Sequence, residues 1–356
     1  MVNHLVINNN NNNNNNLCLS IKYFVYIIAF RNNSSINCSQ YKDDYAVLLS
    51  FPFHVDLNPL LQIPRRTNGL MDAKERIYYL NIINQKYVPL TIYCLKYLQK
   101  LYIRNTSFYN TNHQLPIEID YLATTLTHLS IYDTKITHLP EQIGKLKYLQ
   151  SLELVNTNLI TLPNSIGNLS SLIVLYLPNN KLISLPKTIK NIQSLSQIVL
   201  KNNPYLHSIQ SLNYLSKLKA LQTDNCPIET LPLYLPQLTD LHMSKNNLTN
   251  LIGIRTLGYK TNHRKFFYFN NNHIQSIPPQ IQYVKNLYFL NLDYNHLISL
   301  PLDIFNVTTL HYLYIRYNNF SVIELKAIIE KFNITHPYMK LYYLNRKNSI
   351  VKNIIN

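Results

Sequence analysis

Aromatic residues recur at intervals of 23 residues near the C-terminal end of the chain, at Phe266, Phe289 and Tyr312. Another aromatic residue follows two of them two positions later, at Tyr268 and Tyr314. Aromatic side chains combine a large apolar area with few rotatable bonds, and they anchor many protein interfaces. The chemistry that these residues could perform is therefore noncovalent binding, provided that the fold places them on one surface.

The interval of 23 residues belongs to a repeated pattern of leucines. LTHLSIYDTKITHLPEQIGKLKYL, residues 126–149, is followed by LQSLELVNTNLITLPNSIGNLSSL, residues 149–172, and both keep their leucines and a Leu-Pro pair. The shared pattern is L-x-x-L-x-L-x-x-N-x-L-x-x-L-P-x-x-I-x-x-L. Copies begin at Leu126, Leu149, Leu172, Leu195, Leu218, Leu238, Arg264, Leu287 and Leu310, and weaker copies begin near Leu98, Ile77 and Ser50.

The L-x-L unit of each copy has the period of an extended strand. Both leucines point to one side of the strand, and the residue between them points to the other. One such strand buries too little apolar area to be stable alone, whereas parallel stacking of all copies pairs their backbones and builds one core. The sequence thus predicts a solenoid with a parallel β-sheet on its concave face and short helical or irregular segments on its convex face.

A polar residue recurs three positions after the second strand leucine, where the chain turns inward. Its side chain can satisfy backbone groups that have left the sheet. The Leu-Pro pair comes later in each copy, and its proline ends the strand pairing and directs the chain to the convex face. The polar positions are Asn58, Thr106, Thr134, Thr157, Asn180, Asn203, Cys226, Asn246, Asn272, Asn295 and Asn318.

Over roughly residues 50–320, this pattern resembles the leucine-rich repeat family. The linkers LPEQIGKL and LPNSIGNL resemble the intracellular LPxxIGxL class of Ras-interacting scaffolds and their plant relatives. The resemblance implies an α/β leucine-rich repeat solenoid, a curved horseshoe. It also implies a scaffold that binds other proteins on its concave face, with small GTPases or signalling enzymes as partners by analogy.

Four regions are predicted along the chain. Residues 1–40 form a disordered, low-complexity N-terminus with a poly-Asn run and a short apolar segment, and residues 41–97 form an N-terminal cap with degenerate repeats. Residues 98–320 form the repeat array. Residues 321–356 form a C-terminal capping helix and tail, because Ser321-Val322-Ile323-Glu324 is a capping-box sequence ahead of apolar residues at helical spacing.

The apolar segment Leu17–Phe30, LCLSIKYFVYIIAF, is interrupted by a lysine and is shorter than the roughly 20 residues of a spanning helix. It follows the poly-Asn run and precedes no small-residue cleavage site, unlike a signal peptide. We therefore expect a buried or poorly ordered flanking segment and no membrane association.

Four cysteines lie far apart, at Cys18, Cys38, Cys94 and Cys226, with no Cys-x-x-Cys pair. This spacing favours neither a zinc site nor a disulfide framework, and it indicates a reducing compartment. We expect a cytoplasmic location and a monomeric chain.

No catalytic motif is found. The five glycines are too scattered for a dinucleotide-binding or phosphate-binding loop. H-E-x-x-H, G-x-S-x-G and kinase signatures are also absent from the sequence. We therefore predict no enzyme activity, no catalytic residue, no metal site and no cofactor.

The concave face carries the candidate binding residues. Phe266, Phe289 and Tyr312 occupy equivalent strand positions, and the neighbouring outward positions extend the set in both directions. The alternative is that tyrosine is simply common, with 29 in the chain, and that some rings cover the irregular segment or the cap. The predicted protein-binding residues are Phe266, Tyr268, Phe289, Asn291, Tyr294, Tyr312, Tyr314, Tyr317, Tyr176 and Glu153.

The net charge of +16 is spread along the whole chain, and acidic and basic residues alternate on the concave face. A groove that tracks phosphates needs an unbroken basic stripe, so nucleic acid is the weaker partner. The function predicted first is a non-catalytic protein-binding scaffold in intracellular, Ras-type signalling. The alternatives are a substrate-recognition subunit of a ligase or kinase complex and an RNA-binding module.

Overall fold

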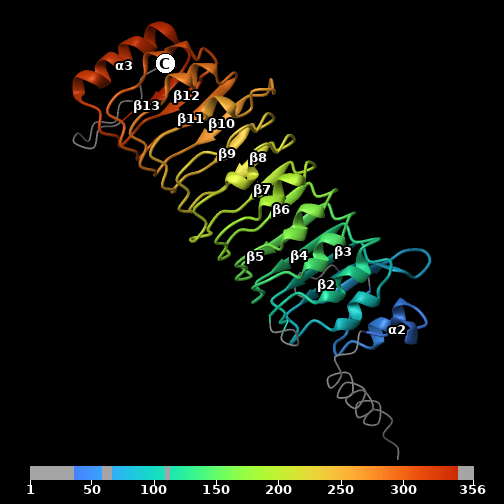
Figure 1. Cartoon of the computed structure of the whole chain (residues 1–356). Coiled ribbons are helices and arrows are strands. Elements are labelled where there is room, and N and C mark those ends of the chain that lie inside the picture. Colours follow the sequence, from blue (N-terminus) through green and yellow to red (C-terminus); the bar gives the residue numbers. More distant parts are fainter. Residues whose placement is uncertain (1–35, 58–65, 109–112, 344–356) are drawn as a thin grey trace, which may run out of the picture.

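One sheet of 13 strands runs along the molecule, in the computed structural model that describes residues 36–57, 66–108 and 113–343. The strands follow one another in sequence order, and from β2 onward every neighbouring pair is parallel (Figure 1). This arrangement confirms the predicted leucine-rich repeat solenoid. The strands are β1 Asn68–Met71, β2 Ile77–Ile83, β3 Lys100–Arg104, β4 His128–Tyr132, β5 Ser151–Val155, β6 Val174–Tyr176, β7 Gln197–Val199, β8 Ala220–Gln222, β9 Asp240–His242, β10 Lys265–Tyr268, β11 Leu287–Asn291, β12 Tyr312–Tyr314 and β13 Lys340–Tyr342.

Short 3-10 helices line the side opposite the strands (Figure 1). Most of them begin directly after a proline with an extended backbone, for example Pro140 and Pro163, as the Leu-Pro pairs predict. Gly144 lets successive helices pack closely, since an added Cβ would lie 2.4 Å from the backbone oxygen of Ser165. The 3-10 helices are η1 Cys38–Gln40, η2 Leu90–Cys94, η4 Ile117–Leu122, η5 Glu141–Lys145, η6 Asn164–Asn168, η7 Lys187–Asn191, η8 Gln210–Leu212, η9 Ile254–Thr256, η10 Pro279–Tyr283 and η11 Leu302–Asn306.

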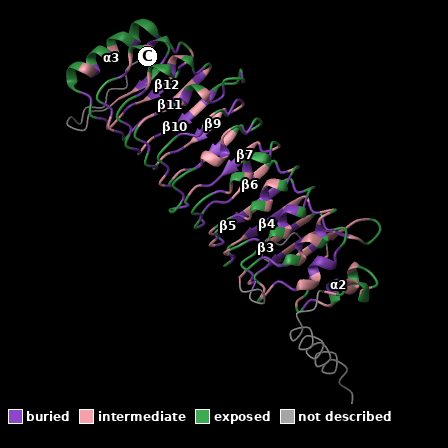
Figure 2. Cartoon of the chain, viewed as in Figure 1, coloured by how far each residue is buried: buried purple, intermediate pink, exposed green. Residues whose placement is uncertain are grey.

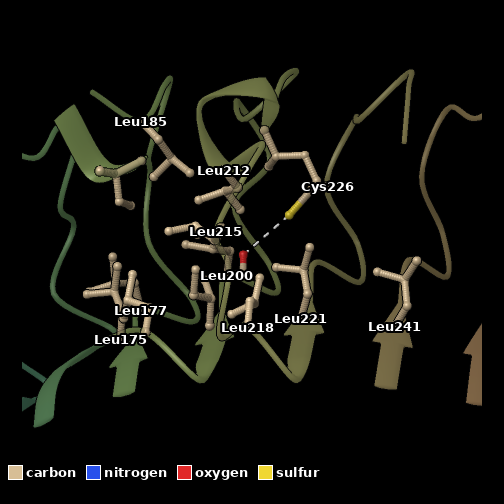
Figure 3. Packing of buried hydrophobic residues seen from close by; sticks show 14 of the residues in the cluster. Leu175, Leu177, Leu185, Leu200, Leu212, Leu215, Leu218, Leu221, Cys226 and Leu241 are labelled. Carbon is tan, nitrogen blue, oxygen red and sulfur yellow. Dashed lines mark hydrogen bonds between the residues drawn. The ribbon is translucent and has the colours of Figure 1, made fainter. Parts of the chain in front are cut away.

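A single apolar core extends through the stack, from Val47 to Leu341 (Figure 2). The strand leucines of successive turns, such as Leu175 and Leu221, point into it and are fully buried (Figure 3). Because each turn covers the apolar side of the next, the core is as long as the solenoid.

The recurring polar residue satisfies buried backbone groups. Asn180 Oδ1 accepts hydrogen bonds from the backbone N–H groups of Thr157 and Leu159, and its Nδ2 donates to the carbonyl of Leu154 at 2.7 Å. Cys226 replaces the asparagine of one turn, and its thiol donates to the carbonyl of Leu200 at 3.3 Å (Figure 3). Asn58, the first predicted member of this series, lies outside the described residues.

Thr134 differs from the predicted role. Its hydroxyl is buried, and no hydrogen-bond partner for it is found among the described residues. Its side chain ends one atom nearer the backbone than that of asparagine, so it reaches fewer of the surrounding backbone groups.

The weak repeat expected near Ser50 runs into residues 58–65, which lie outside the described residues. Helix α2, Asp44–Leu49, packs at the N-terminal end of the stack, and β1 pairs with β2 in the antiparallel sense. Among the described residues, α2, the antiparallel strand β1 and a parallel bridge between Asp56 and Asn68 lie at this first apolar face of the stack.

A disulfide bond joins Cys38 to Cys94, with the two Cα atoms 5.2 Å apart. The expectation that the cysteines form no disulfide was therefore wrong. Cys94 ends helix η2 in the first turns of the stack, and Cys38 begins η1, so folding brings together residues 56 positions apart. With a disulfide present, the cysteines no longer indicate a reducing compartment.

At the C-terminal end, helix α3, Val322–Thr335, covers the last turn (Figure 1). The Ser321 hydroxyl accepts from the Glu324 N–H, as its capping box predicts, and Phe332 packs on Phe305 with ring centres 4.5 Å apart. Strand β13 follows the helix and pairs with β12, in the region predicted to hold the cap and the tail.

None of the helices among the described residues is long and apolar enough to cross a membrane. The predictions for the poly-Asn run, for Leu17–Phe30 and for the tail after Tyr343 concern segments outside the described residues.

We expect the disulfide to stabilise the N-terminal cap by about 2–4 kcal/mol, because it restricts the unfolded chain. Dithiothreitol should lower the Tm of the wild-type chain and leave that of Cys38→Ser unchanged, as measured by circular dichroism. Cys226→Ala serves as the control and should respond to dithiothreitol as the wild type does. Identical wild-type melting curves with and without the reductant would contradict this prediction.

We also expect Asn180→Ala to destabilise the chain by about 3 kcal/mol, since it leaves several buried backbone groups without partners. Asn191→Ala, at the exposed end of η7, should change the unfolding free energy by less than about 0.5 kcal/mol. Urea denaturation measures both values, and equal midpoints for the two variants would be evidence against the role assigned to Asn180.

Candidate functional site

The structure confirms the two predicted rows of outward-facing residues. Phe266 pairs in register with Phe289, and Phe289 with Tyr312. In the adjacent row, Asn291 lies between Tyr268 and Tyr314. Most of these side chains are half-buried, so each still presents atoms to solvent.

The rings of β9 to β13 form one continuous aromatic surface. Phe289 lies near its middle, with its ring centre 4.7 Å from that of Tyr268 and 5.2 Å from that of Tyr314. Tilted contacts at these distances are favourable for aromatic pairs. The members of the aromatic surface are His242, Phe266, Tyr268, Tyr288, Phe289, Tyr312, Tyr314 and Tyr342.

Neighbouring strands stack several of these rings face to face. His242 lies 4.2 Å from Tyr268 with 17° between the ring planes, and Tyr314 lies 4.1 Å from Tyr342 with 5° between them. Burial lowers the pKa of His242, so this ring is neutral at pH 7. Burial and the neighbouring Tyr342 hydroxyl raise the pKa of Tyr314 to about 12, which keeps its hydroxyl protonated. The rings of His242 and Tyr314 are therefore uncharged at pH 7.

Tyr294 and Tyr317 form a separate tyrosine pair at the C-terminal ends of β11 and β12, with ring centres 4.2 Å apart. Both have a left-handed backbone, with φ of 56° and 57°. Asparagine or aspartate occupies this position in most other turns, with Lys245 as the exception beside the two tyrosines. The equivalent positions are Asn84, Asn105, Asp133, Asn156, Asn179, Asn202, Asn225, Lys245, Asn271, Tyr294 and Tyr317.

An ion pair lies between the tyrosine pair and the aromatic surface. The Arg316 guanidinium donates to the carboxylate of Asp293, with Nε 2.8 Å from Oδ2, and the Arg316 N–H donates to the other oxygen. Burial raises the pKa of Asp293, and Arg316 offsets part of that rise. The hydrogen bond from the Arg316 backbone N–H also holds the Asp293 carboxylate in place, so both charges have fixed positions beside the aromatic surface.

Glu153 and Tyr176 lie apart from the other predicted residues. They are register neighbours on β5 and β6, several strands from the aromatic surface. Glu153 accepts hydrogen bonds from Ser151 Oγ at 3.1 Å and from the Tyr132 hydroxyl. Because its oxygens already have partners within the chain, we do not place Glu153 in the same site as Phe289.

One turn begins one residue later than predicted. Lys265, not Arg264, pairs with Leu287, and a bulge follows before Phe266. The Lys265 side chain is fully buried at the leucine position, and its ammonium donates to the carbonyl of Lys285. Gly258, with φ of 66°, makes room for it, since a Cβ there would lie 2.2 Å from Lys265 Cε.

Three members of the aromatic surface were not predicted from the sequence, namely Tyr288, His242 and Tyr342. Tyr288 precedes the regular outward positions, His242 occupies an outward position but is neither phenylalanine nor tyrosine, and Tyr342 lies on the unpredicted strand β13. A shallow hollow of about 550 Å³ beside Phe266 was also missed, because it is formed by different turns. Among the described residues, no group of three or more His, Cys, Asp or Glu side chains is arranged to hold a metal ion.

Comparison with known proteins agrees with this architecture. Residues 121–251 match the family model of a leucine-rich repeat region. No curated protein matches the sequence. Residues 121–251 therefore carry a leucine-rich repeat region, and the sheet that extends beyond them has the same solenoid architecture.

Several solved structures share the fold. An internalin from Listeria monocytogenes is 18% identical with a TM-score of 0.59, and the match covers 78% of this chain and 72% of that one. The Arabidopsis receptor kinase HAESA, solved with the peptide hormone IDA and the co-receptor SERK1, is 22% identical with a TM-score of 0.55, covering 71% of this chain and 42% of that one. A plant ice-binding protein is 22% identical with a TM-score of 0.52, and the match covers 65% of this chain and 77% of that one.

Lys265 generates a prediction about pH. Burial lowers its pKa from 10.5 to about 8, so between these values the unfolded chain binds more protons than the folded chain, and stability rises with pH. We expect Lys265→Met to raise Tm by a few degrees at pH 7, where the buried charge is fully present. The gain should shrink as pH rises from 8 towards 10.5.

Differential scanning calorimetry of Lys265→Met at several pH values measures this effect. Lys285→Met, at an exposed position in the same turn, should show no such dependence. A Tm difference that stays constant over the whole pH range would be inconsistent with a buried ammonium.

Proposed function

We propose that this protein is a non-catalytic scaffold that binds another protein through the aromatic surface. The observation that carries the proposal is the continuity of this surface over five neighbouring strands, β9 to β13. The row of Phe266, Phe289 and Tyr312 holds Ser151, Val174, Gln197 and Ala220 in earlier turns, so nothing in the repeat itself requires rings there. Contiguous exposed aromatic residues mark interaction sites.

The tyrosine pair supports the same conclusion. A left-handed backbone costs a tyrosine roughly 1–2 kcal/mol, whereas asparagine adopts it more readily. Tyr294 and Tyr317 adopt this unfavourable backbone conformation at a position where most other turns have asparagine. The Tyr294 side chain is 44% exposed. Backbone strain is commonly kept at functional sites. Tyr214 and Tyr234 share the conformation and also stack, but neither lies next to a strand end, whereas Tyr294 and Tyr317 lie three residues beyond the ends of β11 and β12.

The stacking of the rings favours a protein over RNA as the partner. Single-stranded nucleic acids bind by placing bases on exposed aromatic faces. Here Tyr268 stacks on His242 and Tyr314 on Tyr342, and Phe289 packs at a tilt against both tyrosines, so little of either ring face is left for a base. Ring edges and hydroxyls suit the apolar side chains and amide groups of a polypeptide.

The identity of the partner is a finer proposal. The LPxxIGxL linkers resemble those of Ras-interacting scaffolds, which suggests a small GTPase and a cytoplasmic, monomeric chain. The peptide hormone in the HAESA complex suggests a peptide instead. Because disulfides persist in oxidising compartments, Cys38–Cys94 weighs against the cytoplasmic partner and against a ligase or kinase subunit there.

A pull-down with the full chain tests the proposed function. We expect Phe266→Ala, Phe289→Ala and Tyr312→Ala, combined, to lose partners that the wild type retains. The affinity for a given partner should fall at least about 100-fold, since aromatic hot spots each contribute about 2 kcal/mol or more.

The matched control replaces three exposed tyrosines outside the strands, Tyr121, Tyr148 and Tyr283, with alanine. This variant should keep the wild-type partners. Identical partners for all three proteins would show that the aromatic surface is not the binding site, and circular dichroism establishes that the variants are folded.

A further inference from the structure

Three exposed cations lie along one edge of the aromatic surface. Lys219 and Arg264 directly precede β8 and β10, and Lys340 begins β13. In a parallel sheet, strand starts share one edge, so these side chains form a basic rim on the same side of the concave face.

Aromatic rings hold two of these cations in place. The Arg264 guanidinium carbon lies 4.3 Å from the centre of the Tyr288 ring, and that ring stacks at 4.5 Å on His311, which directly precedes β12. The Lys340 ammonium lies 5.9 Å from the centre of the Tyr312 ring. Cation–π contacts orient a charge without neutralising it.

The basic rim has little acidic compensation. Four ion pairs occur within the described parts of the chain, and none of them includes Lys219, Arg264 or Lys340. Asp240 is the acidic residue at this edge, and its carboxylate accepts a hydrogen bond from Thr239. The rim therefore keeps an excess of positive charge beside an apolar floor.

The acids at the opposite edge already have partners. Asp293 is bound by Arg316, and Asp224 Oδ1 accepts from the Ser244 N–H at 2.9 Å. The two edges thus differ. The carboxylates at the strand ends are hydrogen-bonded within the chain, whereas the three cations at the strand starts take part in none of the four ion pairs. Complementary charge selects and orients a partner at such a surface.

The dimensions suit an extended segment. Five strands at about 4.8 Å spacing make the aromatic surface about 20 Å across, the length of about six extended residues. At its basic edge, the hollow of about 550 Å³ is lined by Lys219, Asp240, Thr261, His263, Arg264 and Phe266. It has room for a carboxylate side chain beside a bound segment.

We propose that the partner segment is an extended acidic polypeptide, whose apolar side chains lie on the aromatic surface and whose carboxylates face the basic rim. This inference rests on the proposed function and adds the chemistry of the partner. Asp and Glu side chains on one side of the segment contact Arg264 and Lys340.

Selection from a random 12-residue phage-displayed library against the full chain tests the proposal. The bound peptides should be enriched in Asp and Glu relative to the unselected library, and should also carry aromatic or aliphatic residues. One selected peptide is then synthesised, together with a copy in which Asn and Gln replace each Asp and Glu.

Fluorescence anisotropy compares their affinities. We expect the double variant Arg264→Gln, Lys340→Gln to bind the acidic peptide at least about tenfold more weakly than the wild type does. The amide copy should bind the wild type about tenfold more weakly than the acidic peptide does. It should bind the double variant with nearly the same affinity as the acidic peptide, because the two changes remove the same interaction. Lys187→Gln with Lys190→Gln, on η7, is the control and should bind as the wild type does.

The outcomes separate this inference from the proposed function. Peptides that depend on Phe289 but show no acidic enrichment, or that bind equally as amides, would overturn the acidic partner and leave protein binding intact. A selection without any Phe289-dependent peptide would overturn both. Displacement of the peptide by polyuridylate, with loss of that effect in the rim variant, would replace the acidic polypeptide by a nucleic acid.

Discussion

The inward leucines of each turn can be buried only against those of the next turn, and the rest of the structure depends on this constraint. A strand of three to five residues has no stable fold of its own. The stack removes its apolar side from water, and buried asparagines such as Asn180 satisfy the backbone where each turn leaves the sheet. Every other feature is built around positions that this core leaves free.

A stack of turns has two apolar ends, and the two ends are closed in different ways. At the N-terminal end, α2, the antiparallel strand β1 and the bond from Cys38 to Cys94 form the cover. At the C-terminal end, α3 packs Phe332 on Phe305, and β13 then adds one more parallel strand. That last strand also brings Tyr342 to the aromatic surface, so the cap contributes to the candidate site.

The departures from the repeat gather near that site. Lys265 is buried in place of a leucine, Gly258 accommodates it, and the bulge that follows leaves Arg264 outside at the basic rim. The left-handed tyrosine pair lies one and two turns further on. Stacking alone would be served better by a leucine in place of Lys265 and by asparagine in place of Tyr294 and Tyr317. The unfavourable residues are therefore consistent with a surface that binds a partner.

The sequence alone determined the solenoid, the positions of most parallel strands, the capping helix and the rows of Phe266, Phe289 and Tyr312. Each of these follows from a regular spacing of apolar residues along the chain. Contacts between residues far apart in the sequence were decided only by the tertiary structure. Cys38 meets Cys94 because α2 and η1 fold back on the first turns, and Arg264 lies over Tyr288 because a one-residue bulge shifts the register. A repeat pattern specifies what successive turns share, whereas caps, bulges and ring stacking depend on how particular side chains fill the space between turns.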